Sequence, residues 1–312
     1  MRVLVYGAGV IGCELAHELC KGENDVTLLA RGKWKDTIDK KGLIIRHYVQ
    51  LHTTVDFIST IDQLEPEDMF DLIFVVMQYG QLEEVLLPVA RNISKRVILV
   101  GNNMDAKGCE ETIKKNSVVK KEVAFGFQGT AGRREEEKVI SIHTKSSMTI
   151  GGINGMSKEF VKTIKEVFRA TGYQLKKEPN MDAWLKCHMA FILPICYLCY
   201  GLDGKLKRVR SKQISNVFDA VIEAHEMLKK LGYPIRPDGE EEYFLQGRKE
   251  HETMLFLMAK TPLGMLAAGD HAMHAVDEMK KLDKEFMKLK AEAGIQMPVW
   301  EKLRSEARKD WE

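Results

Sequence analysis

The sequence predicts an α/β protein in which an N-terminal domain built on a parallel sheet is followed by an all-helical C-terminal domain. Up to about residue 150, short apolar runs of β-prone residues alternate with helical patterns. From residue 182 onward, almost every segment has helical periodicity. Because 312 residues are many for a single core, we expect two domains, at residues 1–178 and 179–312.

The opening residues combine a strand, a glycine-rich turn and a helix. Residues 2–6 are apolar and β-prone, and a helical pattern runs to about residue 21. The turn between them is a GxGxxG motif made of Gly7, Ala8, Gly9, Val10, Ile11 and Gly12. In such a motif the glycines permit the tight turn, the approach of a pyrophosphate and close helix packing. The motif predicts a Rossmann-type domain that holds the phosphates of a dinucleotide at a helix N-terminus.

The tip of the second strand indicates which dinucleotide binds. Residues 25–29 form this strand, and Arg31 follows it. Lys33 and Lys35 come next, and no carboxylate appears before Asp36. NAD sites place an acidic residue near this position, whereas an arginine accommodates the 2′-phosphate of NADP. An ordinary basic surface cluster is the alternative, but the preceding motif favours NADP (NADPH) as the cofactor.

Further strands complete the N-terminal domain. Residues 71–77 and 96–100 are expected as buried parallel strands, with a helix over about 82–92 between them. Residues 43–45 and 51–54 are expected as edge strands. Between residues 123 and 152, strand-like runs and a charged turn predict a β-meander that closes the sheet. The helices expected in the C-terminal domain are 180–201, 211–231, 238–259, 271–293 and 298–310.

Composition and charge exclude several classes of protein. The net charge of +2 and the absence of a basic face argue against a nucleic-acid partner. The apolar run 187–202 is under 18 residues and contains Pro194, so we expect a buried helix and no membrane span. The first strand starts at once, which leaves no room for a signal peptide. The six cysteines lack the spacing of a disulfide framework, and the CxxC of Cys196 and Cys199 lies in an apolar stretch, so we expect a reduced, cytoplasmic protein.

The sequence resembles the ketopantoate reductase (2-dehydropantoate 2-reductase) family over nearly its whole length. The resemblance is carried by an ordered set of segments: the glycine loop, Arg31, 98–104, 130–134, 184–186, 265–266, Glu278 and 294–298. It implies the two-domain fold predicted above and NADPH-dependent reduction of a 2-oxo acid to a 2-hydroxy acid. A homodimer is left open as the quaternary state.

Lys186 is the expected catalytic residue. A hydride that arrives at a ketone leaves an alkoxide, which must be stabilised and protonated as it forms. A lysine in the crevice expected between the domains does both, and the family is described as using one at this position as proton donor. The alternative is a solvated helix lysine.

The resemblance also implies further cofactor contacts. Asn102 ends a buried strand and matches a family Asn that bonds the nicotinamide ribose or orients the ring, although an Asn after Gly is often a plain turn residue. Gln78 stands where the family has a lysine, and Gly132 lies in a matching segment. Glu278 matches a family acid near the cofactor and the lysine; its alternative is a solvated carboxylate paired with Lys281.

The departures from the family pattern fall on the substrate side. Ala190 and Pro194 stand where the family has Asn, and Gly264 lies in a helix-break loop where the family has Ser. Losing a hydrogen bond to a charged group costs about 1.5–3 kcal/mol, so we expect a more apolar pocket and a substrate other than ketopantoate. A role in pantothenate biosynthesis is therefore not expected. Asp203 and His188 are candidate replacements, and His188 is expected to be structural.

The sequence leaves two other functions open as alternatives. One is a non-catalytic NADP(H)-binding sensor or regulatory protein, suggested by the missing polar residues. The other is a dehydrogenase for an amino-acid-like or larger hydrophobic 2-oxo acid. A polar cluster in one helical stretch has spacing compatible with a divalent metal, but a solvated helix face is far more common and we expect no metal there. Its members are Asp270, His271, His274, Asp277 and Glu278.

Overall fold

The computed structural model describes residues 1–307, with the backbone alone at Leu263, Ala267, Asp270 and His271. The chain divides into two compact units, Met1–Met181 and Asp182–Glu312. The sequence placed the boundary three residues earlier, near residue 178. Each unit is described by itself below.

The first unit is built on an eight-stranded sheet with the order β12-β11-β8-β7-β6-β1-β2-β5. Its neighbouring strands are parallel except for the antiparallel pair β8 and β11. The strands are β1 (Arg2–Tyr6), β2 (Asp25–Leu29), β5 (Ser59–Ile61), β6 (Leu72–Val76), β7 (Arg96–Val100), β8 (Glu122–Gln128), β11 (Ser147–Gly151) and β12 (Gln174–Lys177). All five residues of β6 are buried, as expected for a strand covered on both faces.

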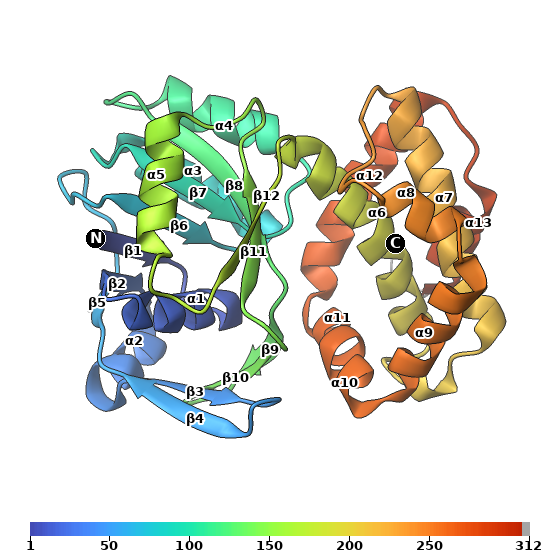
Figure 1. Cartoon of the computed structure of the whole chain (residues 1–312), viewed down its shortest axis with the longest axis horizontal. Coiled ribbons are helices and arrows are strands. Elements are labelled where there is room, and N and C mark those ends of the chain that lie inside the picture. The colour runs from blue at the N-terminus through green and yellow to red at the C-terminus, as the bar shows by residue number, and fades with distance from the viewer. Residues whose placement is uncertain (308–312) are drawn as a thin grey trace. The chain divides into compact units, whose positions relative to one another are not determined.

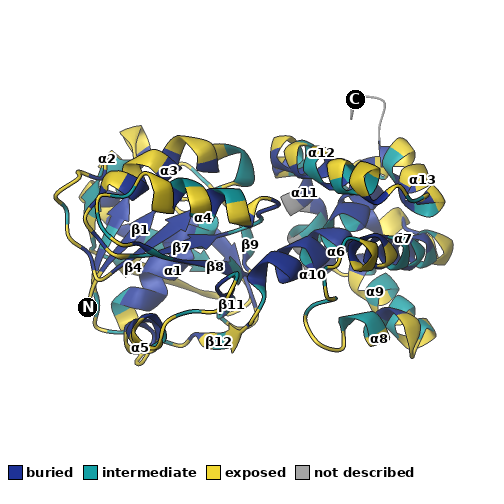
Figure 2. Cartoon of the chain, turned by 90° about the horizontal axis from the view of Figure 1, so that it is seen from above, coloured by how far each residue is buried: buried dark blue, intermediate teal, exposed yellow. Residues whose placement is uncertain are grey.

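Helices cover both faces of this sheet. Figure 2 shows α3 and α4 on one face and α1 and α5 on the other, with buried strands between them. These helices are α1 (Val10–Lys21), α3 (Leu82–Arg91), α4 (Ala106–Lys115) and α5 (Lys158–Val167), and α2 (Gly32–Lys41) follows β2. The sequence analysis did not anticipate α4 and α5, although Asp105 and Ser157 cap them by accepting from Gly108 N and Phe160 N, each at 3.0 Å.

A second, four-stranded sheet corrects the predicted meander. Its order is β4-β3-β10-β9, with β3 (Leu43–His47), β4 (His52–Asp56), β9 (Ala131–Arg134) and β10 (Val139–Ile142) (Figure 1). The segment 123–152 is therefore shared between the two sheets, and β3, expected as an edge strand, is an interior one. All four residues of β10 are buried and three of them pair in parallel with β3. Such long-range pairing leaves no local sign in the strand pattern.

The second unit is helical, as predicted. Its helices are α6 (Met181–Gly201), α7 (Ser211–Lys230), α8 (Glu240–Leu245), α9 (Arg248–Lys260), α10 (Pro262–Gly264), α11 (His271–His274), α12 (Val276–Ala293) and α13 (Pro298–Ala307), with η3 (Met265–Asp270) between α10 and α11. The helix expected over 238–259 is two helices, because Gln246 is extended and Gly247 has a φ of +63°. The last three residues of the helix expected over 298–310 lie outside the described residues.

Helix α6 is long and apolar enough to cross a membrane, with a mean hydropathy of 1.3 over an 18-residue window. It is also longer than the apolar run recognised in the sequence. Within the fold, 78% of that window is buried. This burial is typical of the core helix of a soluble protein.

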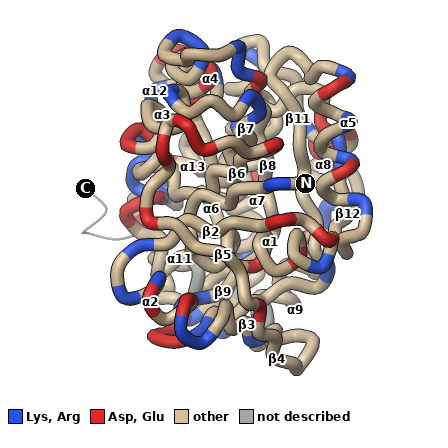
Figure 3. Tube along the Cα trace, turned by 90° about the vertical axis from the view of Figure 1, so that its left-hand side faces the viewer, with Lys and Arg blue, Asp and Glu red and all other residues tan. Residues whose placement is uncertain are grey.

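Charges of both signs are interspersed on α2, which follows the tip of β2. Figure 3 shows both basic and acidic residues along this helix. Lys35 forms an ion pair with Asp39 at 2.6 Å. The basic cluster seen in the sequence after Arg31 is therefore partly neutralised within the helix itself.

Candidate active site

The predicted nucleotide-binding residues meet at one edge of the large sheet. Strand β1 lies between β2 and β6, so the strand order reverses at this point. The register pairs Tyr6 with both Leu29 and Val75, which brings the carboxyl ends of the three strands to one level, and β7 continues the row beside β6. Ligands of open parallel sheets bind at such a reversal. The loops that follow these strands carry Gly7, Arg31, Gln78 and Asn102.

The glycine loop has the geometry that its motif predicts. Gly7 has a φ of +123°, and a Cβ there would lie 2.2 Å from the Val76 carbonyl oxygen. A Cβ on Gly12 would lie 1.9 Å from the Gly7 carbonyl oxygen. At Gly9, by contrast, a Cβ would have no atom within 4 Å. The first turn of α1 starts after Gly9 with no side-chain cap and no acidic residue, so its N–H groups are open to an anion.

Arg31 is held at the tip of β2 by two contacts. Its Nη2 donates to the Tyr6 hydroxyl at 3.2 Å, and its Nε donates to the Asp62 carbonyl at 3.3 Å. Asp62 directly follows β5, whose Ile61 is in register with Leu29. The sequence analysis did not anticipate Asp62 as a neighbour of Arg31, because strand pairing brings its backbone carbonyl there.

Trp34 contacts the glycine loop, and Gly132 lies against the helix that follows it. The Trp34 indole, 7% exposed, donates to the Ala8 carbonyl at 3.0 Å, and sequence reasoning did not anticipate this contact. Gly132 has a φ of +146° and lies where a Cβ would be 2.0 Å from the Ile140 carbonyl oxygen and 3.1 Å from Cγ1 of Val10. Strand β9 therefore packs against the first turn of α1, and Gly132 is needed for that close approach.

Asn102 and Asn103 have different roles. The Asn103 side chain accepts from Asp105 N at 2.8 Å and contacts the Cys109 sulfur at 3.5 Å, so it organises the turn after β7. The Asn102 Oδ1 is buried and has no hydrogen-bond partner. Buried acceptors without a partner are rare in folded proteins, so Asn102 is the member of this pair that is available to a ligand. Gln78, after β6, is exposed and begins a short turn.

Lys186 lies near the start of α6 and is 4% exposed. Its ammonium forms an ion pair with Asp182, which is 3% exposed, and lies 4.8 Å from the ring centroid of Tyr233. The solvated-lysine alternative is therefore wrong. The spacing of four residues between Asp182 and Lys186 is that of helix ion pairs, and this signal was available in the sequence but not used.

Glu278 is also buried, at 8% exposure in the first turn of α12, so the solvated-carboxylate alternative does not hold. Burial, with smaller contributions from neighbours that include Glu278, raises the pKa of Cys196. Burial also raises the pKa of Cys199 to about 12. These thiols are therefore protonated core groups, as expected from the apolar stretch around them.

The candidate substrate residues do not all lie close to one another in the structure. Ala190 and Pro194 are buried and follow Lys186 at intervals of four residues, so the three share one face of α6. Asp203 follows the C-terminal end of α6, and at 1.5 Å per residue about 22 Å of helix separates that end from Lys186. This distance is more than a small 2-oxo acid spans.

Gly264 and His188 have structural explanations. A Cβ on Gly264 would lie 2.1 Å from the Met258 carbonyl oxygen, so close packing on α9 excludes a side chain there. The His188 ring stacks on Trp184 with centroids 5.0 Å apart, and burial lowers its pKa to about 3. The polar cluster considered for a metal cannot be assessed as a set, because the side chains of Asp270 and His271 lie outside the described residues.

The fold and the glycine loop define a class of protein: a unit with a Rossmann-type sheet and glycine loop followed by a helical unit. Solved structures share this fold. The 2-dehydropantoate 2-reductase from Geobacter metallireducens GS-15 has a TM-score of 0.75 at 16% identity, covering 98% of this chain and 99% of that one. A D-mandelate dehydrogenase solved with NADH and anilino(oxo)acetate has a TM-score of 0.75 at 16% identity, covering 98% and 97%.

Sequence comparison identifies the family. Residues 3–155 match the family described as ketopantoate reductase PanE/ApbA. The 2-dehydropantoate 2-reductase of Pyrococcus horikoshii is 24% identical over 184 residues, 59% of this chain and 58% of that protein. That of Pyrococcus abyssi is 27% identical over 194 residues, 59% of each. The matches thus span less than two thirds of these relatives. These matches support a divergent member of the ketopantoate reductase family, as the resemblance implied, and the solved structures confirm the fold class predicted from the sequence.

Proposed function

We propose that the protein is an NADPH-dependent reductase that converts a 2-oxo acid to a 2-hydroxy acid. The observation that carries this proposal is the alignment of the glycine loop, Arg31 and Asn102 along one sheet edge, in a chain of this family. Each of these groups suits a different part of the cofactor.

The residues present fit a phosphorylated nicotinamide dinucleotide. The uncapped N-terminus of α1 would hold the pyrophosphate above the open space at Gly9. The Arg31 guanidinium would pair with the 2′-phosphate. The unpartnered Oδ1 of Asn102 would accept a hydrogen bond from the nicotinamide ribose or carboxamide. When bound, the cofactor supplies a hydride to the keto carbon.

Lys186 would complete the reduction. As the keto oxygen gains negative charge, the Lys186 ammonium stabilises it and transfers a proton to it, so that the substrate gains one hydride and one proton in total. The neutral lysine then regains a proton from solvent. Asp182 holds the ammonium in place and offsets the cost of burying it.

The substrate class follows from the face of α6 that carries Lys186. Ala190 and Pro194 give this face no side-chain hydrogen-bond donor, and Gln78 is neutral where the family has a cation. We therefore favour an apolar or aromatic 2-oxo acid over ketopantoate. The similarity in fold to a D-mandelate dehydrogenase solved with anilino(oxo)acetate is consistent with this class.

A panel of 2-oxo acids tests the function. NADPH oxidation would be followed with ketopantoate, short aliphatic 2-oxo acids and aryl 2-oxo acids as substrates. We expect turnover with a bulky apolar or aryl member and weak turnover with ketopantoate. Stoichiometric NADPH binding without oxidation of any member would contradict the reductase and favour the non-catalytic NADP(H)-binding protein.

Arg31 is expected to determine the cofactor preference. Arg31→Ala should weaken NADPH binding by about 10- to 150-fold, because hydrogen bonds to a charged group contribute about 1.5–3 kcal/mol and each 1.4 kcal/mol is tenfold. NADH binding should change little. Calorimetric titration of both nucleotides checks this, with Lys33→Ala, an exposed neighbour on α2, as the control. An equal loss for NADH and NADPH would contradict the assignment of Arg31 to the 2′-phosphate.

Location and quaternary state are also proposals. We propose a cytoplasmic protein, since none of the six cysteines, all within the described residues, forms a disulfide. We further propose a homodimer, and the half-exposed Met254, Leu257 and Met258 on α9 are consistent with a subunit contact. Sedimentation equilibrium tests the dimer; a monomer at micromolar concentration would contradict it.

A further inference from the structure

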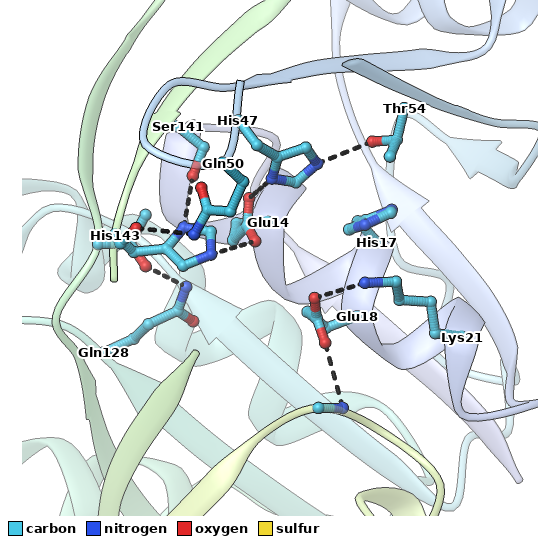
Figure 4. A network of polar contacts seen from close by, with 12 residues as sticks. Glu14, His17, Glu18, Lys21, His47, Gln50, Thr54, Gln128, Ser141 and His143 are labelled. Atoms are coloured by element: carbon cyan, nitrogen blue, oxygen red, sulfur yellow. Dashed lines mark hydrogen bonds and ion pairs between the residues drawn. The ribbon is translucent and has the colours of Figure 1, made fainter. Parts of the chain in front are cut away.

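Three residues far apart in the sequence meet in the core of the first unit. Glu14 lies on α1, His47 ends β3, and His143 directly follows β10 (Figure 4). Their exposed fractions are 0%, 3% and 9%. One ligand atom from each lies within 4.8 Å of the others. The function proposed above assigns no role to these three residues.

Each histidine is oriented by a hydroxyl on its outer nitrogen. His47 Nε2 lies 2.9 Å from Thr54 Oγ1, and His143 Nδ1 lies 3.1 Å from Ser141 Oγ. When these hydroxyls accept the ring N–H, the inward nitrogens, His47 Nδ1 and His143 Nε2, carry lone pairs. Metal-ligating histidines are oriented in this way by a partner on the other ring nitrogen.

The inward nitrogens face the two oxygens of Glu14 at a distance that suits an intervening cation. His47 Nδ1 is 3.7 Å from Oε2, and His143 Nε2 is 3.5 Å from Oε1. A charged hydrogen bond would be about 2.7–2.9 Å long. Two ligand atoms on one tetrahedral zinc, each about 2.0–2.2 Å from the metal, lie about 3.4 Å apart. The observed separations are closer to the second value.

The polar atoms of the Glu14 carboxylate lack a hydrogen bond. Among the described residues, eight buried side-chain atoms make no hydrogen bond, and four of them belong to the network of Figure 4. These four are both Glu14 oxygens, His17 Nε2 and Gln128 Oε1. An unpaired buried group calls for a water or an ion, and the two Glu14 oxygens, which both face histidine nitrogens, point to an ion.

We propose that Glu14, His47 and His143 bind a divalent transition-metal ion of the zinc class. Two imidazoles and one carboxylate are the three protein ligands of zinc sites that keep a fourth position for water. Calcium and magnesium prefer oxygen ligands alone, so this set selects against them. The metal would join α1, the helix whose N-terminus receives the pyrophosphate in the proposed function, to the four-stranded sheet.

The charge states of the cluster are compatible with a metal. Burial, together with the neighbouring His17 and His52, lowers the pKa of His47 to about 4, so this ring is neutral at pH 7. Burial raises the pKa of Glu14, whereas a bound cation would favour the ionised carboxylate. The other charged neighbours are already paired: Lys21 with Glu18 at 2.9 Å, and His17 with Asp56 at 2.6 Å.

Metal titration of the full-length protein tests this site. Chelator-treated protein would be titrated with Zn²⁺ against a chromophoric competitor, and with Co²⁺ to record its visible spectrum. We expect one tightly bound metal per chain and a Co²⁺ spectrum of nitrogen and oxygen ligands. Thiolate charge-transfer bands would show binding to cysteines and overturn the proposal.

Substitutions test whether Zn²⁺ binds at these three residues. Glu14→Gln and His143→Gln should each weaken Zn²⁺ binding by about 100-fold or more, since even second-shell changes cost about 10–100-fold. Thr54→Val, which removes the partner of His47, should fall in that second-shell range. His52→Gln is the matched control, because His52 stacks on His47 at 4.5 Å but is exposed and not a ligand. If one variant fails to fold, the other is tested; binding equal to wild type in a folded variant overturns the site.

Discussion

Replacing Lys186 with alanine is expected to lower kcat by about 100-fold or more, the usual range for loss of a general acid. The reason is that Ala190 and Pro194, which follow Lys186 on the same face of α6, carry no proton that could replace that of the lysine. NADPH binding should be retained, since the predicted cofactor contacts of the first unit are unchanged. Steady-state kinetics with the best 2-oxo acid, together with NADPH titration, measures both effects.

The buried ion pair makes a stability control necessary. Lys186→Ala removes the ammonium that pairs with the buried Asp182 carboxylate, which costs about 3–5 kcal/mol of folding free energy. The double variant Asp182→Asn/Lys186→Met removes both charges and should recover most of that stability without recovering turnover. Thermal unfolding separates the two effects. Wild-type turnover in either folded variant would remove Lys186 from the mechanism.

Alanine at Gly9 and at Gly12 is expected to have opposite consequences. Gly12→Ala places a Cβ 1.9 Å from the Gly7 carbonyl oxygen, an overlap that should lower the free energy of unfolding by about 1–3 kcal/mol or more. Gly9→Ala meets no atom within 4 Å and Gly9 has a φ of −78°, so the free energy of unfolding should change little. NADPH affinity should nevertheless fall, because the new methyl group occupies the space assigned to the pyrophosphate.

Urea unfolding and nucleotide titration of both variants check this contrast. Undiminished NADPH affinity in Gly9→Ala would contradict the placement of the pyrophosphate above this residue. Undiminished stability in Gly12→Ala would contradict the close contact between helix and strand.

Local patterns in the sequence predicted the strands and the helix around the glycine loop well. Residues 2–31 form a strand, turn, helix and strand whose pairing partners are close in the chain, so the motif contained nearly all the information. The second sheet escaped prediction because β10 pairs with β3, almost a hundred residues earlier. Alternation of apolar residues shows that a strand exists but does not show which strand it joins.

The difference between local patterns and long-range contacts also decides which site residues could be predicted from the sequence. Lys186 was found through the family resemblance, and its partner Asp182 was visible in the helix spacing but overlooked. The cluster of Glu14, His47 and His143 was not foreseen because its members lie on three elements from both ends of the first unit. The metal hypothesis considered from the sequence rested on neighbours in one helix, where close spacing is visible without the fold.

The two edge strands of the large sheet affect the tendency of the protein to aggregate at high concentration. At one border, β5 has only three residues. At the other, β12 presents Lys176 and Lys177. An unpaired strand edge recruits strands from other molecules unless it is short or charged. Both borders therefore discourage aggregation through intermolecular β-pairing, which lets a largely buried parallel sheet persist in a crowded solution.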